Sequence, residues 1–293
     1  MEDILTALAL RLKQKDNSAN KGTNGTLTVA AGSELYRGAA ALASSAALRC
    51  GVGIVRLVSV EKVISSAAAR LPECVFLPTE SENGAMSYRD FARKMPAFSK
   101  SRAVLAGCGM TDCTDTGNII AELIKYGGYQ LIIDADGLNS IKNRPELLKS
   151  AALPPVITPH IGEMARLTGA SADAIKSDRE KTAAEFSRKY NCITVLKDCK
   201  TVISSPEGKL FVCDRPNAGL AKGGSGDVLS GIISSFAAQG YDAFDAAVCG
   251  TALHSLAAES AREKLTEYSM LPSDIVAEIP GVFARIGKTR NYR

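Results

Sequence analysis

The feature that most constrains the fold of this chain is the alternation of short apolar runs with segments of helical periodicity. The apolar runs are bounded by glycine, proline or acidic residues, which is typical of β-strands buried on both faces. Because helical segments lie between most of them, the strands are expected to run parallel. We predict an α/β fold with a central, mostly parallel β-sheet and helices on both faces. The expected strands lie within Gly25–Gly32, Gly53–Val60, Ser101–Gly109, Tyr129–Asn139, Pro154–His160, Cys192–Asp198, Lys200–Pro206 and Lys209–Cys213.

Helices are expected where apolar residues recur about every 3.6 residues. The polar segment Thr79–Tyr88 is instead predicted to be an exposed loop. Residues 1–20 resemble a short helix with a polar lead-in, and residues 1–293 are expected to form a single domain. The expected helices lie at Gly38–Gly51, Thr116–Tyr126, Ala172–Tyr190, Ser225–Gln239 and Ala243–Lys264.

Composition and charge exclude several classes of protein. Of the 293 residues, 46% are hydrophobic and 23% are charged, which is ordinary for a soluble globular protein. The net charge of +4 comes without a block of like charge, so nucleic-acid binding has no support. The longest apolar run, around Gly38–Leu48, is too short for a membrane span, and the N-terminus lacks the pattern of a signal peptide. We expect a cytoplasmic protein with no membrane partner.

The cysteines and histidines argue against disulfides and zinc. The chain has eight cysteines, none in a CxxC pair, and several lie in apolar contexts typical of core positions. His160 and His254 are the only two histidines, so a zinc site built on cysteine and histidine pairs is not expected. His254 lies in an alanine-rich helical segment and is expected to be a core or helix-packing residue.

The stretch Asn217–Gly240 places a glycine-rich turn directly before an apolar helix. A helix N-terminus presents free N–H groups and the positive end of the helix dipole, and glycines allow a phosphate to approach the backbone. An anion site with the Asp227 carboxylate beside it is therefore one interpretation. The alternative is an ordinary turn in which Ser225 or Asp227 caps the helix.

Polar side chains also follow four of the expected strands, at the edge where parallel sheets bind ligands. Four such strand endings, together with the glycine-rich turn, favour a nucleotide-dependent enzyme over a protein in which these residues serve only packing. The residues at the strand ends are Gly107 and Gly109; Asp134, Asp136 and Asn139; His160, Gly162 and Glu163; and Lys197, Asp198 and Thr201.

Taken in order along the chain, these motifs resemble the NAD(P)H-hydrate dehydratases, a family with the ribokinase-like fold. The resemblance covers nearly the whole chain. Its most specific segments are "ITPHIGEMARLTG", "LKDCKTVI" and "NAGLAKGGSGDVLSGII", preceded by "KGTNGTLTVAAGSELYRGAAALASSAALRCGVGIV", "GCGM" and "IIDADGLN".

The resemblance implies repair of a damaged cofactor. Water adds to the nicotinamide ring of NADH or NADPH, and the 6-hydroxy product cannot carry hydride. A nucleotide phosphorylates that hydroxyl, phosphate leaves with help from the ring nitrogen lone pair, and the dihydronicotinamide is restored. The implied partners are small molecules: the hydrated cofactor, and ADP or ATP with Mg²⁺.

The resemblance also implies residue roles. Asp227 would be the general base, kept ionised by the helix N-terminus, and would also contact the substrate. Glu163 would help to place Mg²⁺ or cap the following helix, and Asp134 and Asp136 would steer metal-bound phosphates. The expected nucleotide-binding residues are Lys197, Asp198, Cys199, Lys200, Thr201, Gly223, Gly224, Ser225 and Gly226, and the expected substrate-binding residues are Gly38, Ala39, Ala40, Gly107, Gly109, Asn139 and His160.

Some positions depart from the family pattern. Cys108 replaces the usual proline of a GPG turn, Asp198 and Cys199 stand in a loop expected to contain glycine, and Asn20 stands where many relatives carry histidine. The donor is expected to be ADP, because the segments resemble bacterial forms, with ATP as the alternative. A ribokinase-like kinase for a vitamin precursor and a non-catalytic nucleotide sensor are further alternatives. Family members are often multimeric, so a homo-oligomer is expected.

Overall fold

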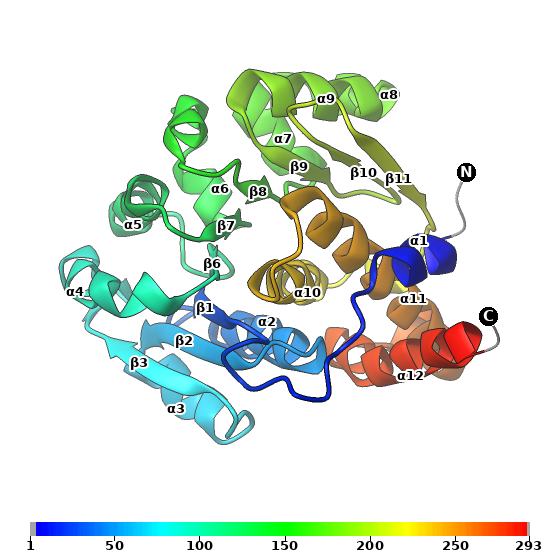
Figure 1. Ribbon diagram of the computed structural model, residues 1–293. Helices are drawn as coiled ribbons and strands as arrows, with labels where there is room; N and C mark the ends of the chain where they lie inside the picture. The colour runs from blue at the N-terminus through cyan, green and yellow to red at the C-terminus, as the bar shows by residue number, and fades with distance from the viewer. Residues whose placement is uncertain (1–3, 292–293) are drawn as a thin grey trace.

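A twisted sheet of nine strands runs through the computed structural model, which describes residues 4–291 (Figure 1). Most neighbouring strands are parallel, whereas β10 pairs antiparallel with both β9 and β11. The predicted α/β fold with a mostly parallel sheet is confirmed. In spatial order the strands are β11 (Leu210–Asp214), β10 (Lys200–Ser204), β9 (Ile193–Leu196), β8 (Val156–Ile157), β7 (Gln130–Ile133), β6 (Ala103–Ala106), β1 (Thr26–Ala30), β2 (Ile54–Val60) and β3 (Val75–Thr79).

Helices cover both faces of this sheet. On one face α10 packs against β6, α2 against β2, and α11 against β10, while α12 lies outside α11 and α2 (Figure 1). On the other face α9 packs against β9 and β10, with α4, α5 and α6 beyond it along the sheet. The α-helices are α1 (Ile4–Arg11), α2 (Arg37–Arg49), α3 (Glu61–Ala68), α4 (Tyr88–Lys94), α5 (Thr114–Tyr126), α6 (Asp136–Ser140), α7 (Ile161–Thr168), α8 (Ala172–Ser177), α9 (Arg179–Tyr190), α10 (Ser225–Ala238), α11 (Ala243–Ser269) and α12 (Pro272–Asn291).

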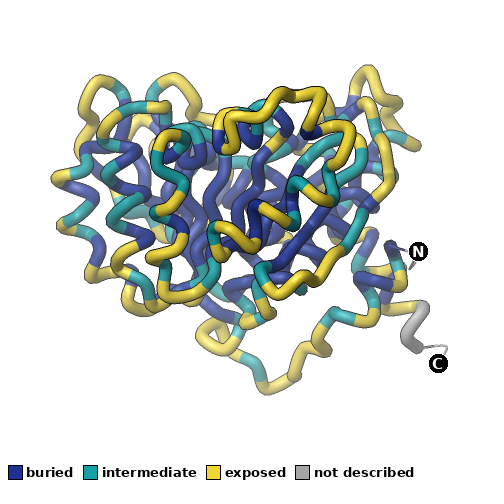
Figure 2. The backbone as a smooth tube through the Cα atoms, turned by 90° about the horizontal axis from the view of Figure 1, so that it is seen from above, coloured by how far each residue is buried: buried dark blue, intermediate teal, exposed yellow. Residues whose placement is uncertain are grey.

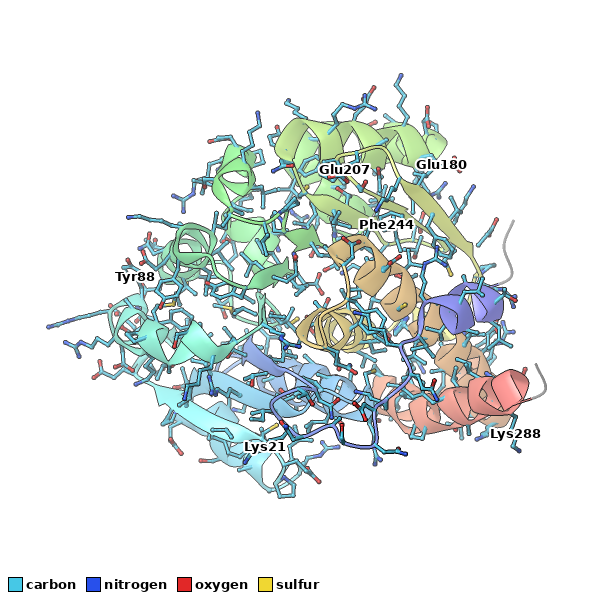
Figure 3. The ribbon with its side chains drawn as sticks, in the orientation of Figure 1. Lys21, Tyr88, Glu180, Glu207, Phe244 and Lys288 are labelled. Carbon is cyan, nitrogen blue, oxygen red and sulfur yellow. The ribbon has the colours of Figure 1, made fainter. Side chains whose placement is uncertain are left out.

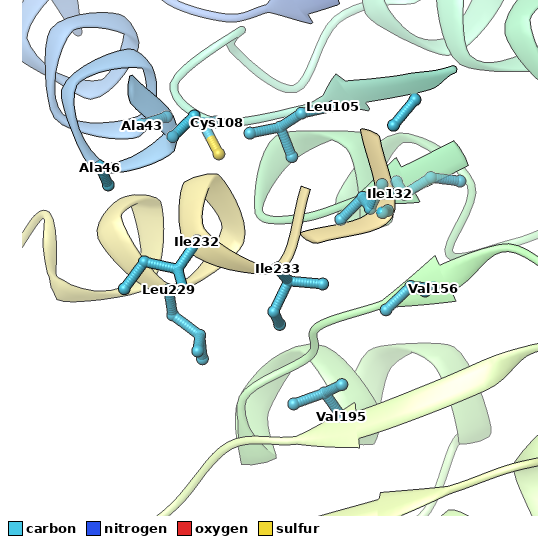
Figure 4. Close-up of a cluster of buried hydrophobic side chains, with 14 of the residues drawn as sticks. Ala43, Ala46, Leu105, Cys108, Ile132, Val156, Val195, Leu229, Ile232 and Ile233 are labelled. Atoms are coloured by element: carbon cyan, nitrogen blue, oxygen red, sulfur yellow. The ribbon is translucent and has the colours of Figure 1, made fainter. Parts of the chain in front are cut away.

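Helix α10 lies at the centre of the molecule. Almost all of its residues from Val228 to Ala238 are buried, because α2, α11 and the sheet enclose it (Figure 4). The buried side chains form one continuous core that extends from Ile4 in α1 to Ile286 in α12, and exposed residues lie in the outer loops and on the outer sides of helices (Figure 2). This position fixes the glycine-rich turn before α10 at the carboxyl edge of the sheet.

Two expectations from the sequence were wrong in detail. Thr79–Tyr88 is not an exposed loop, because β4 (Ser81–Glu82) and β5 (Ala85–Met86) form a hairpin that buries Ala85 and Met86. The helix expected at Ala172–Tyr190 is interrupted at Asp178, whose side chain accepts a hydrogen bond from the N–H of Lys181 and caps α9. A capping side chain gives a new helix start that periodicity alone does not reveal.

The other expected helices lie where the sequence places them, within a few residues at their ends. The long helix α11 continues five residues beyond the expected end at Lys264, but it is kinked at Thr266, where φ is 65°. No helix within residues 4–291 is long and apolar enough to cross a membrane.

The contact between α10 and α2 generates a stability prediction. A Cβ at Gly231 would lie 2.2 Å from the backbone oxygen of Ala43, whereas a Cβ at Gly281 in α12 meets nothing within 4 Å. Helix propensity favours alanine over glycine by about 1 kcal/mol at both sites. Gly281→Ala should therefore be neutral or stabilising. Gly231→Ala should lower the free energy of unfolding by about 1–3 kcal/mol, since the backbones must separate. Urea unfolding of both variants measures this, and equal effects would contradict it.

Candidate functional site

The carboxyl ends of β6, β7, β8 and β9 lie next to one another, so the polar residues that follow them converge. A bridge between His160 and Lys197 continues the pairing of β8 and β9 past the ends of these strands. The N–H of Lys197 donates to the carbonyl of Pro159 at 2.8 Å. Helix α10 begins beside these strand ends. The polar residues that the sequence places at the carboxyl edge of the sheet therefore form one continuous site.

A buried ion pair lies at the centre of this site. Asp134 is 1% exposed, and its Oδ1 accepts a hydrogen bond from Nζ of Lys197 at 2.7 Å. Its Oδ2 accepts a hydrogen bond from the Ser230 hydroxyl at 2.6 Å. Burial opposes ionisation of Lys197, but the charges of Asp134 and Glu163 outweigh it and raise the pKa of this lysine. Both oxygens of Asp134 are thus occupied, and the lysine remains charged.

Asp227 does not cap α10. The N-cap residue is Gly224, with φ at 101°, and no side chain caps the helix end. A Cβ at this position would lie 2.6 Å from Leu42, so space as well as conformation favours glycine. The interpretation of Ser225 or Asp227 as helix caps was therefore wrong.

The surroundings of Asp227 shift the pKa of its carboxyl group. Burial, followed by repulsion from Asp134, raises it to about 6, although the nearby Cys108 thiol and the charge of Lys197 oppose the rise. The positive end of the helix was expected to keep the carboxylate ionised. It stays largely ionised at neutral pH, but a pKa close to operating pH is what a general base requires.

His160 and Glu163 form a capping box at the start of α7. Nδ1 of His160 accepts hydrogen bonds from the N–H groups of Gly162 and Glu163, while Oε2 of Glu163 accepts from the N–H of His160 at 2.8 Å. Burial lowers the pKa of His160 and raises the pKa of Glu163 to about 7. An accepting Nδ1 leaves the proton of the neutral imidazole on Nε2. His160 can therefore donate a hydrogen bond to a ligand.

A cavity of about 850 Å³ opens beside the glycine-rich turn. Its size suits a nucleotide-sized ligand. Cationic side chains of Lys176, Lys197, Arg215 and Lys222 line it together with the backbone of the turn. It brings together the predicted residues His160, Lys197, Asp198, Cys199, Thr201, Gly223, Gly224, Ser225 and Gly226, and adds Asn217, Thr251, His254 and Ser255.

Four buried polar atoms in the cavity wall have no hydrogen-bond partner within the protein. They are Nδ2 of Asn217, Oγ of Ser225, Oγ1 of Thr251 and Nε2 of His254. Buried polar groups in native proteins are nearly always paired, so this cluster marks a place where a ligand or water supplies partners. Sequence reasoning missed Thr251 and Ser255. The signal for them was polar residues three and four positions apart in an otherwise apolar helix.

His254 is buried, as expected, with 7% of its surface exposed. It also lines the cavity. Burial lowers its pKa to about 4, and a hydrogen bond with the backbone of Ser225 opposes this. The imidazole is therefore neutral at physiological pH.

Most residues that the resemblance assigned to the substrate lie outside this cavity, beyond the Asp134–Lys197 pair. A Cβ at Gly107 would lie 1.9 Å from the backbone oxygen of Asp134, and one at Gly109 would lie 2.9 Å from Cβ of Ala39 in α2. These glycines therefore bring the turn after β6 against both the acidic strand end and the start of α2. Oδ1 of Asn139 accepts a hydrogen bond from Arg166 at 2.9 Å on the same edge.

Two charged residues of the predicted nucleotide loop have other partners. Nζ of Lys200 is 3.0 Å from Oε1 of Glu180, which lies on α9 at the periphery of the molecule, and Lys200 does not line the cavity (Figure 3). The carboxylate of Asp198 pairs with Arg179. Burial raises the pKa of this carboxyl group, but the hydrogen bond and the charge of Arg179 outweigh burial and leave the pKa below its usual value.

No cluster of three or more histidine, cysteine, aspartate or glutamate side chains within the described part of the chain could hold a metal ion. The capping role expected for Glu163 is present, and its metal role remains a prediction.

Comparison with known proteins gives this geometry a family context. The family model described as NAD(P)H-hydrate dehydratase matches residues 27–281. A bifunctional NAD(P)H-hydrate repair enzyme of Moorella thermoacetica is 32% identical over 286 residues, which are 97% of this chain and 54% of that enzyme. The chain thus spans about half the length of such bifunctional relatives. An ADP-dependent (S)-NAD(P)H-hydrate dehydratase of Xanthomonas campestris is 30% identical over 283 residues, 96% of each chain.

Solved structures show the same fold. The ADP/ATP-dependent NAD(P)H-hydrate dehydratase of Bacillus subtilis, co-crystallised with ATP and Mg²⁺, has a TM-score of 0.83 and 26% identity over 97% of both chains. A ribokinase-like superfamily protein of Enterococcus faecalis has a TM-score of 0.83 and 23% identity over 96% of this chain and 94% of its own. The fold is ribokinase-like, as predicted.

The raised pKa of Glu163 leads to a prediction about pH. In the folded state the pKa of Glu163 is about 7, whereas its ordinary value is 4.5. The protonated carboxyl group therefore contributes to the free energy of unfolding at low pH. This contribution is lost as pH rises through about 7, because the buried group must then ionise. Glu163→Gln keeps an acceptor for the capping box and does not ionise. The variant should match wild type near about pH 5 and exceed its unfolding free energy by on the order of 1 kcal/mol near about pH 8.

Urea unfolding at the two pH values measures this difference. The matched control is Glu263→Gln at an exposed position of α11, which should differ from wild type by the same amount at both. A pH-independent effect of Glu163→Gln would show that the buried carboxyl does not titrate in this range.

Proposed function

The chain belongs to the NAD(P)H-hydrate dehydratase family, and from this premise we propose that it is a nucleotide-dependent hydro-lyase that restores NADH or NADPH from the hydrated cofactor. The observation that carries the proposal is the position of Asp227. This carboxylate, with its pKa raised to about 6, follows directly after Gly226, which lines the cationic cavity. A phosphoryl donor in the cavity and an acceptor hydroxyl near Gly107 and Gly109 would meet beside it.

The nucleotide would occupy the cavity with its phosphates at the glycine-rich turn. N–H groups at the start of α10 and the charge of Lys197 would stabilise the transferred phosphoryl group. The unpartnered atoms of Thr251 and His254 lie on the cavity wall formed by α11. They suit the hydroxyl and amino groups of a nucleoside. His160, whose Nε2 carries a proton, would donate to the substrate side.

Mg²⁺ would enter with the phosphates of the nucleotide, because Mg²⁺ is usually held by one or two carboxylates together with substrate phosphates. Both oxygens of Asp134 already accept hydrogen bonds from Lys197 and Ser230, so this carboxylate would act on the ion through its charge. Glu163 is the carboxylate that we propose to support the ion, whose charge would offset that of the phosphates.

Asp227 would accept the proton of the 6-hydroxyl as that oxygen attacks the terminal phosphorus of the donor. The leaving group is AMP when ADP is the donor, and ADP when ATP is the donor. The C6–O bond of the phosphorylated ring then breaks as the N1 lone pair moves toward C6, and phosphate departs. Loss of a proton from C5 completes the double bond and restores the dihydronicotinamide.

ADP is the proposed donor and ATP the alternative. The cationic residues of the cavity support a nucleotide polyphosphate as the donor. A vitamin-precursor kinase would use the same cavity and differ at the acceptor side. The homo-oligomeric state and the cytoplasmic location remain predictions.

The proposal predicts that the protein regenerates the absorbance of reduced nicotinamide when hydrated NADH is supplied with ADP or ATP. Asp227→Asn keeps the size of the side chain but removes the base, so turnover should fall about 10² to 10⁴-fold while nucleotide binding and thermal unfolding stay near wild type. In wild type, kcat should decrease as pH is lowered through about 6.

No absorbance recovery with either nucleotide would contradict the proposed function. A kinase would consume nucleotide with an alcohol acceptor instead, and a sensor would bind nucleotide without turnover. Turnover within a few-fold of wild type in Asp227→Asn would place the base elsewhere.

A second prediction concerns the phosphate site and uses two lysines of one loop. Lys197→Ala should weaken ADP binding by about tenfold or more, because a charge-assisted contact contributes roughly 1.5–3 kcal/mol. Lys200→Ala should leave the dissociation constant within about twofold, since Lys200 pairs with Glu180 and surface pairs contribute little. Calorimetric titration with ADP measures both. An equal effect of the two substitutions would mean that the phosphates lie elsewhere.

A further inference from the structure

The glycine-rich turn before α10 must keep one shape although its own residues do little to fix it. Glycine loses more conformational freedom on folding than any other residue, and Gly223, Gly224 and Gly226 follow one another closely here. A Cβ at Gly223 would meet nothing within 4 Å, and no side chain caps the start of α10. The shape of the turn therefore depends on contacts with the elements around it.

Lys222, which directly precedes the turn, makes such a contact with the end of α11. Its Nζ donates hydrogen bonds to the carbonyl of Tyr268 at 2.8 Å and to the carbonyl of Met270 at 2.6 Å. Carbonyls at a helix C-terminus lack partners within the helix, and the negative end of the helix dipole attracts a cation. Although Lys222 lines the cavity, its ammonium group is thus directed at the backbone of α11.

The connection between α11 and α12 touches the same stretch of chain at two more places. A Cβ at Gly219 would lie 2.1 Å from Sδ of the completely buried Met270, and one at Gly224 would lie 3.2 Å from Cγ of Pro272. The connection is itself held in an unfavourable conformation, because the β-branched Thr266 has a φ of 65°. Such a conformation persists only where the surrounding structure determines it.

Lys197 contacts the turn in a different way. A Cβ at Gly226 would lie 3.3 Å from Nζ of Lys197, and the same Nζ pairs with Asp134 at 2.7 Å. The charge of Lys197 is therefore directed at the N-terminus of α10, whereas that of Lys222 is directed at two carbonyls on the other side of the turn.

We propose that Lys222 is a positioning residue for the phosphate site. Its ammonium group ties the glycine-rich turn to the end of α11 and so holds the N–H groups of the turn in the shape that receives a phosphate. Lys197 supplies charge to the phosphate, and Lys222 supplies the geometry of the backbone. The inference rests on the proposed function, because the turn receives phosphate only if the cavity binds a nucleotide.

The test removes the ammonium group and observes the turn before any nucleotide is present. Lys222→Met keeps an unbranched apolar side chain but removes the donor. The N–H groups of Ala221 and Ser225 are hydrogen-bonded within the turn, at 3.1 Å and 3.3 Å, so their hydrogen exchange reports its opening. In the nucleotide-free variant their exchange should be about tenfold faster, and the dissociation constant of ADP should rise about tenfold, because a charge-assisted hydrogen bond is lost.

Lys264→Met is the matched control. Lys264 also lies on α11, but its Nζ pairs with Glu278 of α12 at 2.7 Å and does not contact the turn. Exchange in the turn and the dissociation constant of ADP should both stay within about twofold of wild type. Lys222→Arg, which keeps a cationic donor, should restore most of both quantities. If Lys222→Met does not fold, Lys222→Gln replaces it, since its shorter neutral side chain also removes the cation.

Two results would overturn the proposal. Weaker ADP binding with unchanged exchange in the nucleotide-free protein would mean that Lys222 contacts the phosphate directly. Faster exchange with an unchanged dissociation constant would leave Lys222 a contact that serves stability alone. Neither measurement uses the hydrated cofactor. A wild type that binds ADP but does not restore the reduced cofactor would therefore refute the proposed function and not the role of Lys222, whereas a wild type that does not bind ADP would refute both.

Discussion

The buried pair of Asp134 and Lys197 is the interaction on which the rest of the site depends. It joins the ends of β7 and β9 across β8, and the Ser230 hydroxyl ties α10 to the same carboxylate. Removing one partner of such a pair leaves an uncompensated buried charge, which costs about 3–5 kcal/mol. The pair also sets the electrostatics, because Asp134 raises the pKa of Asp227 while drawing Lys197 toward itself.

This pair divides the site into two halves of different chemistry. On one side lies a cavity with cationic walls and the glycine-rich turn before α10, and on the other lie glycine turns that bring backbones together without side chains. Asp227 is at the boundary between the halves, in the first turn of α10. Because α10 is buried in the core, the position of its first turn is determined by the packing of the entire domain.

Sequence reasoning located the site edge and every strand of the sheet except β3, because apolar runs and strand-end polar residues are local signals. It did not predict α3, α4, α6 or α12. It could not detect the break at Asp178 or the burial of Met86, which depend on a capping side chain and on contacts with distant elements. The cavity face of His254 was missed, because an alanine-rich helix gives no sign of which side packs against other elements. The helix terminus next to Asp227 is visible in the sequence, whereas the burial of this carboxyl group and its closeness to Asp134, which raise its pKa to about 6, depend on the fold.

The unpartnered atoms of Asn217, Ser225, Thr251 and His254 have a consequence for conformational stability. These atoms pair with a ligand only when the chain is folded, so a ligand that hydrogen-bonds to them stabilises the folded state over the unfolded one. Ligand binding and folding are then linked equilibria, and a ligand at about a hundred times its dissociation constant adds roughly 2.7 kcal/mol to the stability of the folded state. Cellular ligand concentration would in this way govern how long the protein survives unfolding and proteolysis.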